Sequence, residues 1–180
     1  MSSSSDFYLA FDCFTKEQVK EINKEIKKNI FEKEPLQGAA KYTTKKGKFF
    51  YVPCSSLMNL LYPWLYECQL INKQVFGYDI YWDFHIESLN YNVYGKNDEY
   101  GWHIDANDVH EYDLKLTCLL NLSEESYEGG EFKLIGVNEK IKFDSGEGLI
   151  INSLMAHKVT PVTKGERITL TYWAWGPSWR

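Results

Sequence analysis

The sequence predicts a mainly β protein in which N-terminal helices pack on a β-sandwich. Two amphipathic helical patterns occupy residues 1–77, and a hydrophobic period of two dominates residues 78–180. Turns rich in Gly and Asn separate the later segments at short intervals, which is typical of sandwiches and barrels. Because the chain has 180 residues, we expect one domain over residues 1–180, with helical support and early strands before the β core.

The N-terminal segment predicts a strand followed by a helix. Residues 7–11 are apolar and form a run short enough for one strand. Thr15 is a typical N-cap residue, and Gln18 stands three positions later, where its capping-box partner is expected. The helical pattern ends near Pro35. Its apolar residues recur at helical spacing: Val19, Ile22, Ile26 and Ile30.

A second helical pattern follows a segment that we expect to be a loop. Residues 36–54 carry Lys, Thr and Gly around a short aromatic run. An apolar stripe with helical spacing then begins at Leu57 and ends at Ile71. Pro63 falls inside this stripe and lacks a backbone N–H, so either a kink or two abutting helices is expected.

Alternation of side chains predicts the strands of the second half. Residues 80–87 and 114–122 alternate in the way expected of strands with one buried face. Shorter apolar runs bounded by turn residues predict further strands at residues 131–136, 140–143, 147–152, 157–161 and 166–175. We expect these strands to form the sandwich against which the helices pack.

Composition and charge disfavour several classes of protein. The net charge is −5 and basic residues cluster only at residues 45–48, which disfavours a nucleic-acid partner. None of the four cysteines forms a Cys-x-x-Cys pair, so we expect reduced thiols and a cytoplasmic location. The sequence shows no secretion signal and no apolar run of membrane-spanning length, so no membrane partner is expected. Monomer and homodimer both stay open.

Three dispersed residues carry the strongest functional signal. His103 and Asp105 are two positions apart, so their side chains share one face of a strand. His157, from another strand, can complete a triangle of ligands. Two imidazoles and one carboxylate with open positions favour non-haem Fe(II) and oxygen chemistry. We expect the other two histidines, His85 and His110, to be structural or exposed.

Arg167 is a candidate anion-binding residue ten positions after His157. In a strand over residues 166–175 it shares a face with Thr169 and Trp173. A carboxylate is the partner that its planar guanidinium fits best. A structural salt bridge is the alternative that this pattern leaves open.

Taken in order, these motifs resemble a known family over residues 88–177. They are similar to the 2-oxoglutarate- and Fe(II)-dependent dioxygenases of the prolyl 4-hydroxylase type, in particular to small single-domain members from bacteria and their phages. The matching motifs are Tyr94-Gly95, Tyr100-Gly101-Trp102-His103-Ile104-Asp105, Glu128-Gly129-Gly130, the run from Pro161 to Arg167, and Trp173. The resemblance implies a double-stranded β-helix, or jelly roll, with two or three supporting helices.

The resemblance also implies roles for individual residues. It assigns Fe(II) ligation to His103, Asp105 and His157. It assigns the distal carboxylate of 2-oxoglutarate to Arg167, and a further contact with this cosubstrate to Tyr94.

Three further residues are expected at the cosubstrate. Trp173 matches a pocket-lining Trp of the family, and Thr169 is a plausible hydroxyl partner because it shares a strand face with Arg167. Some members carry a second Tyr on the strand after His-x-Asp, and this chain has none there. We expect Asn121 to donate a hydrogen bond in its place.

The implied reaction is an oxidative hydroxylation. It consumes 2-oxoglutarate and O2 at Fe(II), releases succinate and CO2, and hydroxylates an unactivated C–H bond, with L-ascorbate as the expected reductant. Asp105 favours hydroxylation, because halogenating relatives lack this carboxylate. Two other classes are a silent jelly-roll module that binds a peptide or sugar, and a cupin-type enzyme without a keto acid. Retention of Arg167 with three ligands argues against the first, and few spare histidines argue against the second.

The substrate that the resemblance favours is a proline in a peptide or protein. Another amino-acid side chain or a free amino acid is the alternative. Nucleobase demethylation is disfavoured, because relatives with that activity carry a second Arg at the position of Trp173. We expect Trp173 to join an aromatic wall around the substrate. The other members of this wall are Tyr100, Trp102 and Trp175.

Overall fold

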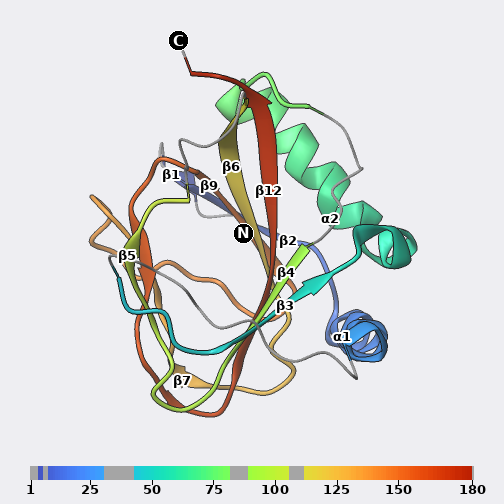
Figure 1. Cartoon of the computed structure of the whole chain (residues 1–180), viewed down its shortest axis with the longest axis vertical. Coiled ribbons are helices and arrows are strands. Elements are labelled where there is room, and N and C mark those ends of the chain that lie inside the picture. Colours follow the sequence, from blue (N-terminus) through green and yellow to red (C-terminus); the bar gives the residue numbers. More distant parts are fainter. Residues whose placement is uncertain (1–3, 6–7, 31–42, 82–88, 106–111, 180) are drawn as a thin grey trace.

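Facing β-sheets and two outer α-helices build the described part of the chain (Figure 1). This computed structural model describes residues 4–5, 8–30, 43–81, 89–105 and 112–179. The paired strands run antiparallel throughout these residues. The predicted architecture, mainly β with N-terminal helices, is confirmed.

The larger sheet has seven strands in the order β1-β2-β9-β6-β12-β4-β3. Its centre is β12, which pairs with β6 on one side and β4 on the other. Strands from the first third of the chain form both of its edges. The strands are β1 (Ser4–Ser5), β2 (Tyr8–Asp12), β9 (Glu147–Asn152), β6 (Tyr112–Asn121), β12 (Arg167–Pro177), β4 (Leu89–Tyr94) and β3 (Lys48–Val52).

The opposite layer consists of shorter strands. A three-stranded sheet has the order β5-β10-β8, and a two-stranded sheet pairs β11 with β7. In Figure 1, β5 and β7 lie on the side of the larger sheet that faces away from the helices. These strands are β5 (Tyr100–His103), β10 (His157–Val159), β8 (Phe132–Leu134), β11 (Val162–Lys164) and β7 (Glu128–Gly129).

Helix α1 (Lys16–Ile30) begins with the predicted capping box. The backbone N–H of Gln18 donates to Thr15 Oγ1 at 3.3 Å, and the backbone N–H of Thr15 donates to Gln18 Oε1 at 2.9 Å. These two bonds satisfy amide groups that have no partner within the helix.

Helix α2 (Met58–Ile71) follows a short 3₁₀ helix, η1 (Cys54–Ser56), and runs into a π-helical turn, η2 (Asn72–Phe76). It contains Pro63 and is one helix rather than two abutting ones. Of the two alternatives expected at this proline, the one with two abutting helices is therefore wrong.

Both helices cover the outer face of the larger sheet. Their apolar stripes meet the side chains that β6, β9 and β12 turn toward them, which gives one continuous core. Its central members are Val19, Ile22, Ile26, Leu61, Trp64, Leu65, Cys118, Leu120, Ile150, Leu170 and Tyr172. A second core fills part of the space between the sheets. Its members include Leu119, Leu149, Ile151, Phe132, Leu134 and Val159.

Asn23 joins α1 to the sheet through two buried hydrogen bonds. Its Nδ2 donates to the carbonyl of Leu122 at 2.8 Å, and its Oδ1 accepts from the hydroxyl of Tyr91 at 3.0 Å. An Asn23→Leu variant leaves both partners unsatisfied, so we expect the free energy of unfolding to fall by about 2–4 kcal/mol. Urea denaturation measures this. Asn29→Leu, on the same helix but bonded only within it, is the control, and an equal loss there would contradict the assignment.

One of the predicted strands is absent and another falls largely outside the described residues. Residues 140–143 do not form a strand, although Ile141 and Phe143 are buried as the alternation predicted. The carbonyl of Phe143 accepts from Asn121 Nδ2 at 2.7 Å instead of from a neighbouring strand. Residues 78–81 are not in a strand, and the rest of the predicted strand 80–87, including His85, lies outside the described residues, as does His110.

Five strands are present where none was predicted: β1, β3, β4, β7 and β11, of which β3 and β4 are the longest. The aromatic run inside the expected loop is β3, and it pairs with β4. In β4 the apolar residues Leu89, Tyr91 and Val93 pack against the helical core. The two residues between them are asparagines, which are uncommon in strands, so the alternation was missed.

Candidate active site

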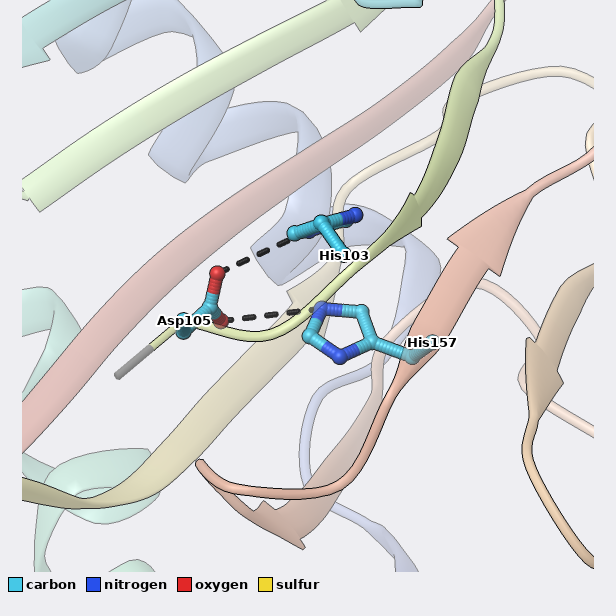
Figure 2. A group of neighbouring side chains, drawn as sticks. All are labelled: His103, Asp105 and His157. Atoms are coloured by element: carbon cyan, nitrogen blue, oxygen red, sulfur yellow. Dashed lines mark ion pairs between the residues drawn. The ribbon is translucent and has the colours of Figure 1, made fainter. Parts of the chain in front are cut away.

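The three predicted metal ligands meet between the two layers (Figure 2). His103 ends β5, Asp105 follows two residues later, and His157 opens β10. The register of the β5–β10 pair sets His103 directly opposite His157. Asp105 Oδ1 lies 3.6 Å from His103 Nε2, and Asp105 Oδ2 lies 3.6 Å from His157 Nε2. One ligand atom from each residue lies within 4.8 Å of the others.

Backbone carbonyls orient both imidazoles. His103 Nδ1 lies 2.8 Å from the carbonyl of Gly101, and His157 Nδ1 lies 2.9 Å from the carbonyl of Met155. A carbonyl only accepts, so the hydrogen of each neutral ring lies on Nδ1. The lone pair of each Nε2 is thereby directed toward Asp105 and is available to a metal ion.

Aromatic rings pack against both histidines, and burial keeps His103 neutral. The ring of Tyr100 stacks on His103 with centroids 3.5 Å apart, and the ring of Phe132 stacks on His157 at 5.3 Å. Burial, followed by the adjacent His157, lowers the pKa of His103 to about 4. A neutral imidazole is the form that ligates a metal ion, so the donor set fits Fe(II).

Two side chains of the larger sheet hold Asp105. The hydroxyl of Thr117 donates to Asp105 Oδ2 at 2.7 Å, and Trp173 Nε1 donates to the same oxygen at 3.1 Å. Thr117 on β6 and Trp173 on β12 are register partners, so the sheet places both donors side by side. Both lone pairs of Oδ2 are used, and no described residue donates to Oδ1. This arrangement leaves Oδ1 for an ion.

A Thr117→Val variant tests this support. Valine keeps the shape of threonine and removes a hydrogen bond to a charged oxygen, so we expect the affinity for Co(II) to fall by about 10–100-fold. Co(II) titration followed by visible absorption measures the change. Thr171→Val is the control, because its hydroxyl accepts from Asn92 and has no contact with Asp105. Equal Co(II) affinity of the Thr117 variant and the wild type would exclude a positioning role.

Arg167 lies in the same cavity as the ligands and is 1% exposed. Its guanidinium carbon lies 5.6 Å from the ring centre of Tyr94 and 5.9 Å from that of Phe143. Nη1 lies 3.5 Å from the hydroxyl of Thr169, and Nε has no hydrogen-bond partner. Among the described residues, no carboxylate lies within salt-bridge distance of this arginine. A buried cation without a counter-ion is costly, which indicates a site for an anionic ligand.

The two glycines of the Gly-Gly motif allow close packing beside Arg167. Gly130 has a φ of +58°, and a Cβ there would lie 3.0 Å from Arg167 Cδ. Gly129 has a φ of +73°, and a Cβ there would collide with the carbonyl of Pro161. Only glycine adopts this backbone readily at both positions.

Four of the residues expected around the cosubstrate and substrate line this cavity: Tyr94, Tyr100, Thr169 and Trp173. Burial raises the pKa of Tyr94, so its phenol stays protonated and is able to donate a hydrogen bond.

Trp102 and Trp175 lie elsewhere, and Asn121 lines a neighbouring cavity that Arg167 also borders. Asn121 donates to Phe143 and accepts from the backbone N–H of Ser123 at 3.0 Å, so its amide is occupied by the fold. Trp102 is 47% exposed and lies against Lys158 rather than in the cavity. A register shift between Ala174 and Trp175 ends the alternation of side chains in β12, so Trp175 does not follow Trp173 into the cavity.

The cavity is also lined by residues that were not predicted to belong to the site, among them Lys45, Asn90 and Thr117. The ammonium of Lys45 lies 4.4 Å from the ring centre of Phe49 and 4.8 Å from that of Tyr100. Burial lowers the pKa of Lys45, and Asp105 acts in the opposite direction. Lys45, Asn90 and Thr117 each belong to a segment whose position depends on pairing with distant strands. No local sequence pattern therefore identifies these residues as part of the cavity.

Known sequences resemble the part of the chain that carries the site. Residues 89–175 match the sequence profile of the 2OG-Fe(II) oxygenase superfamily. A PKHD-type hydroxylase of Alteromonas mediterranea is 41% identical over 93 residues, which are 46% of this chain and 41% of that protein. One from Hyphomonas neptunium is 37% identical over 85 residues, or 43% and 38% of the two chains. The chain thus spans about two-fifths of the length of these curated relatives.

Solved structures resemble nearly the whole chain. A prolyl-4-hydroxylase of Pseudomonas putida has a TM-score of 0.72 and 16% identity, covering 95% of this chain and 93% of that one. A prolyl hydroxylase of Trichoplax adhaerens, bound to a peptide fragment of hypoxia inducible factor, has a TM-score of 0.73 and 17% identity, covering 94% and 84%. These likenesses concern the fold and confirm the predicted jelly roll. In addition, no described helix has the length and apolar character needed to span a membrane.

Proposed function

Since residues 89–175 match the profile of the 2OG-Fe(II) oxygenase superfamily, as the motifs predicted, we propose that this chain is a 2-oxoglutarate- and Fe(II)-dependent dioxygenase. It hydroxylates an unactivated C–H bond. One observation carries the proposal: the three ligand atoms converge within 4.8 Å in a cavity that also contains a buried arginine, which has no carboxylate partner among the described residues. A binding module without chemistry has no use for that combination.

The side chains divide the work between metal and cosubstrate. His103, His157 and Asp105 hold Fe(II) through the atoms that their hydrogen bonds leave free. Arg167 and Thr169, both of which are buried, bind the distal carboxylate of 2-oxoglutarate. When bound, iron and 2-oxoglutarate supply the oxidative chemistry, with O2 consumed and succinate and CO2 released. The protein contributes position, charge and a dry cavity.

A proline in a peptide or protein is the substrate that we propose. The solved neighbours are named as prolyl hydroxylases, and one of them is bound to a peptide. Among the cavity residues, Tyr100 and Trp173 supply aromatic surface for such a ring. We further propose a single catalytic domain, monomeric or homodimeric, that does not act on nucleic acid. Four free cysteines support a cytoplasmic location.

The test is succinate formation by purified protein reconstituted with Fe(II) anaerobically and then exposed to O2. We expect succinate to depend on Fe(II), 2-oxoglutarate and O2, and to increase with proline-containing peptides that gain the mass of one oxygen atom. L-Ascorbate is the proposed reductant and is expected to increase the number of turnovers per enzyme. If the reconstituted protein forms no succinate and does not bind 2-oxoglutarate, the oxygenase function is excluded.

A further inference from the structure

Lys45 is held in a fixed position beside the candidate metal centre. It forms an isolated antiparallel bridge with Tyr100 of β5, the strand that ends at His103. The backbone N–H of Gly101 donates to the carbonyl of Thr44 at 2.7 Å, and that of Lys46 donates to the carbonyl of Glu99 at 2.9 Å. These bonds couple the Lys45 backbone to the strand that carries a ligand.

The side chain of Lys45 lines the cavity, packs against aromatic rings and interacts electrostatically with Asp105. Its ammonium lies over the rings of Phe49 and Tyr100, and Tyr100 in turn stacks on His103. Among the described residues, no carboxylate lies within salt-bridge distance of Lys45, whereas the adjacent Lys46 pairs with Glu99 at 3.5 Å. Lys45 is partly buried, and contacts with ring faces compensate only part of the cost of this partial loss of water.

Lys45 and Arg167 serve different parts of this cavity. Arg167 lies over Tyr94, and Lys45 lies over Phe49. The two rings meet edge to face with centroids 5.7 Å apart, so this aromatic pair separates the two cations. One carboxylate of 2-oxoglutarate is therefore not expected to satisfy both.

In the proposed complex the positive charge of Lys45 is not balanced by any negative charge. The two positive charges of Fe(II) and the one of Arg167 are balanced by Asp105 and the two carboxylates of 2-oxoglutarate. We propose that Lys45 binds an anionic group of the substrate, so that the hydroxylated molecule carries a carboxylate near the oxidised carbon. This inference rests on the proposed function and adds the charge of the substrate to it.

Asn90 gives the substrate a second polar contact in the same cavity. It is 7% exposed, and its Oδ1 has no hydrogen-bond partner. Buried amide atoms are normally paired, so this one is left for a donor on a ligand. An acidic residue of a peptide, or a free amino acid, presents a carboxylate and an N–H group close together.

The experiment measures probe binding to protein that holds Fe(II) and 2-oxoglutarate without O2, by isothermal titration calorimetry. One set of probes consists of capped proline pentapeptides with Glu, Gln or Lys beside the proline. A second set consists of free glutamate and free proline, which distinguishes a side-chain carboxylate from an α-carboxylate. The variants are Lys45→Gln and Lys45→Glu, with Lys46→Gln as a matched control because Lys46 is exposed and already paired.

We expect the wild type to bind carboxylate probes about 10–100-fold more tightly than their uncharged counterparts. Lys45→Gln removes this preference, Lys45→Glu transfers it to the Lys-containing peptides, and Lys46→Gln keeps it. The inference is overturned if no carboxylate probe binds, if the preference survives in Lys45→Gln, or if this variant loses affinity for 2-oxoglutarate instead. Succinate formation without a substrate is measured on the same preparations. If succinate forms, a negative binding result overturns only the role of Lys45. If no succinate forms, the proposed function fails and the inference fails with it.

Discussion

An Asp105→Ala variant is expected to lose Fe(II)-dependent succinate formation by more than about a hundredfold while keeping its fold. Loss of a hydrogen bond to a ligand typically costs 10–100-fold in metal affinity, and loss of the ligand itself removes more. Asp105 is also the only negatively charged member of the triad, so the variant offers a divalent ion two neutral nitrogens. Co(II) binding and succinate formation measure the two parts of this effect.

Stability separates loss of the ligand from loss of the fold. Alanine at position 105 leaves the donors of Thr117 and Trp173 without an acceptor, so the free energy of unfolding is expected to fall by about 1–3 kcal/mol. Asp144→Ala is the control, because Asp144 is exposed and pairs only with Lys142. Wild-type Co(II) affinity in a folded Asp105→Ala protein would remove this residue from the metal site.

Local patterns identified the ligands but not the residues that support them. His103 and Asp105 are two positions apart, and this spacing alone predicts a shared face. Thr117 contacts Asp105 because β6 pairs with β12 in the register that sets Thr117 opposite Trp173. Register between strands depends on the packing of the whole sheet, so no window of the sequence contains it.

The missed and misplaced elements have similar causes. β4 alternates as a strand should, but Asn90 and Asn92 form its cavity face, and a polar face of asparagines resembles a loop. Trp175 is expected beside Trp173 in the aromatic wall, but the register shift after Ala174 breaks the period of two that would turn both side chains to one face. Both features lie beside the cavity, which Asn90, Asn92 and Trp173 line and where function constrains the sequence.

An Arg167→Met variant is expected to bind 2-oxoglutarate more weakly than the wild type and, at the same time, to be more stable. Methionine keeps much of the aliphatic volume of arginine and removes the charge that binds the distal carboxylate. Breaking a buried charge pair costs about 3–5 kcal/mol, so the KM for 2-oxoglutarate is expected to rise by well over tenfold. Succinate formation over a range of 2-oxoglutarate concentrations measures this, and an unchanged KM would remove Arg167 from its proposed role.

The same substitution is expected to raise the free energy of unfolding of the ligand-free protein. Arg167 is 1% exposed and has no counter-ion among the described residues, and its contacts with the rings of Tyr94 and Phe143 recover only part of the desolvation cost. Added 2-oxoglutarate stabilises the wild type by mass action and leaves the variant unchanged. Lys164→Met, which removes an exposed lysine paired with Glu128, is expected to change neither quantity. A less stable Arg167→Met protein would mean that the charge of Arg167 is already compensated without ligand. A more stable variant that no longer responds to 2-oxoglutarate means that the fold keeps a costly buried charge in order to bind its cosubstrate.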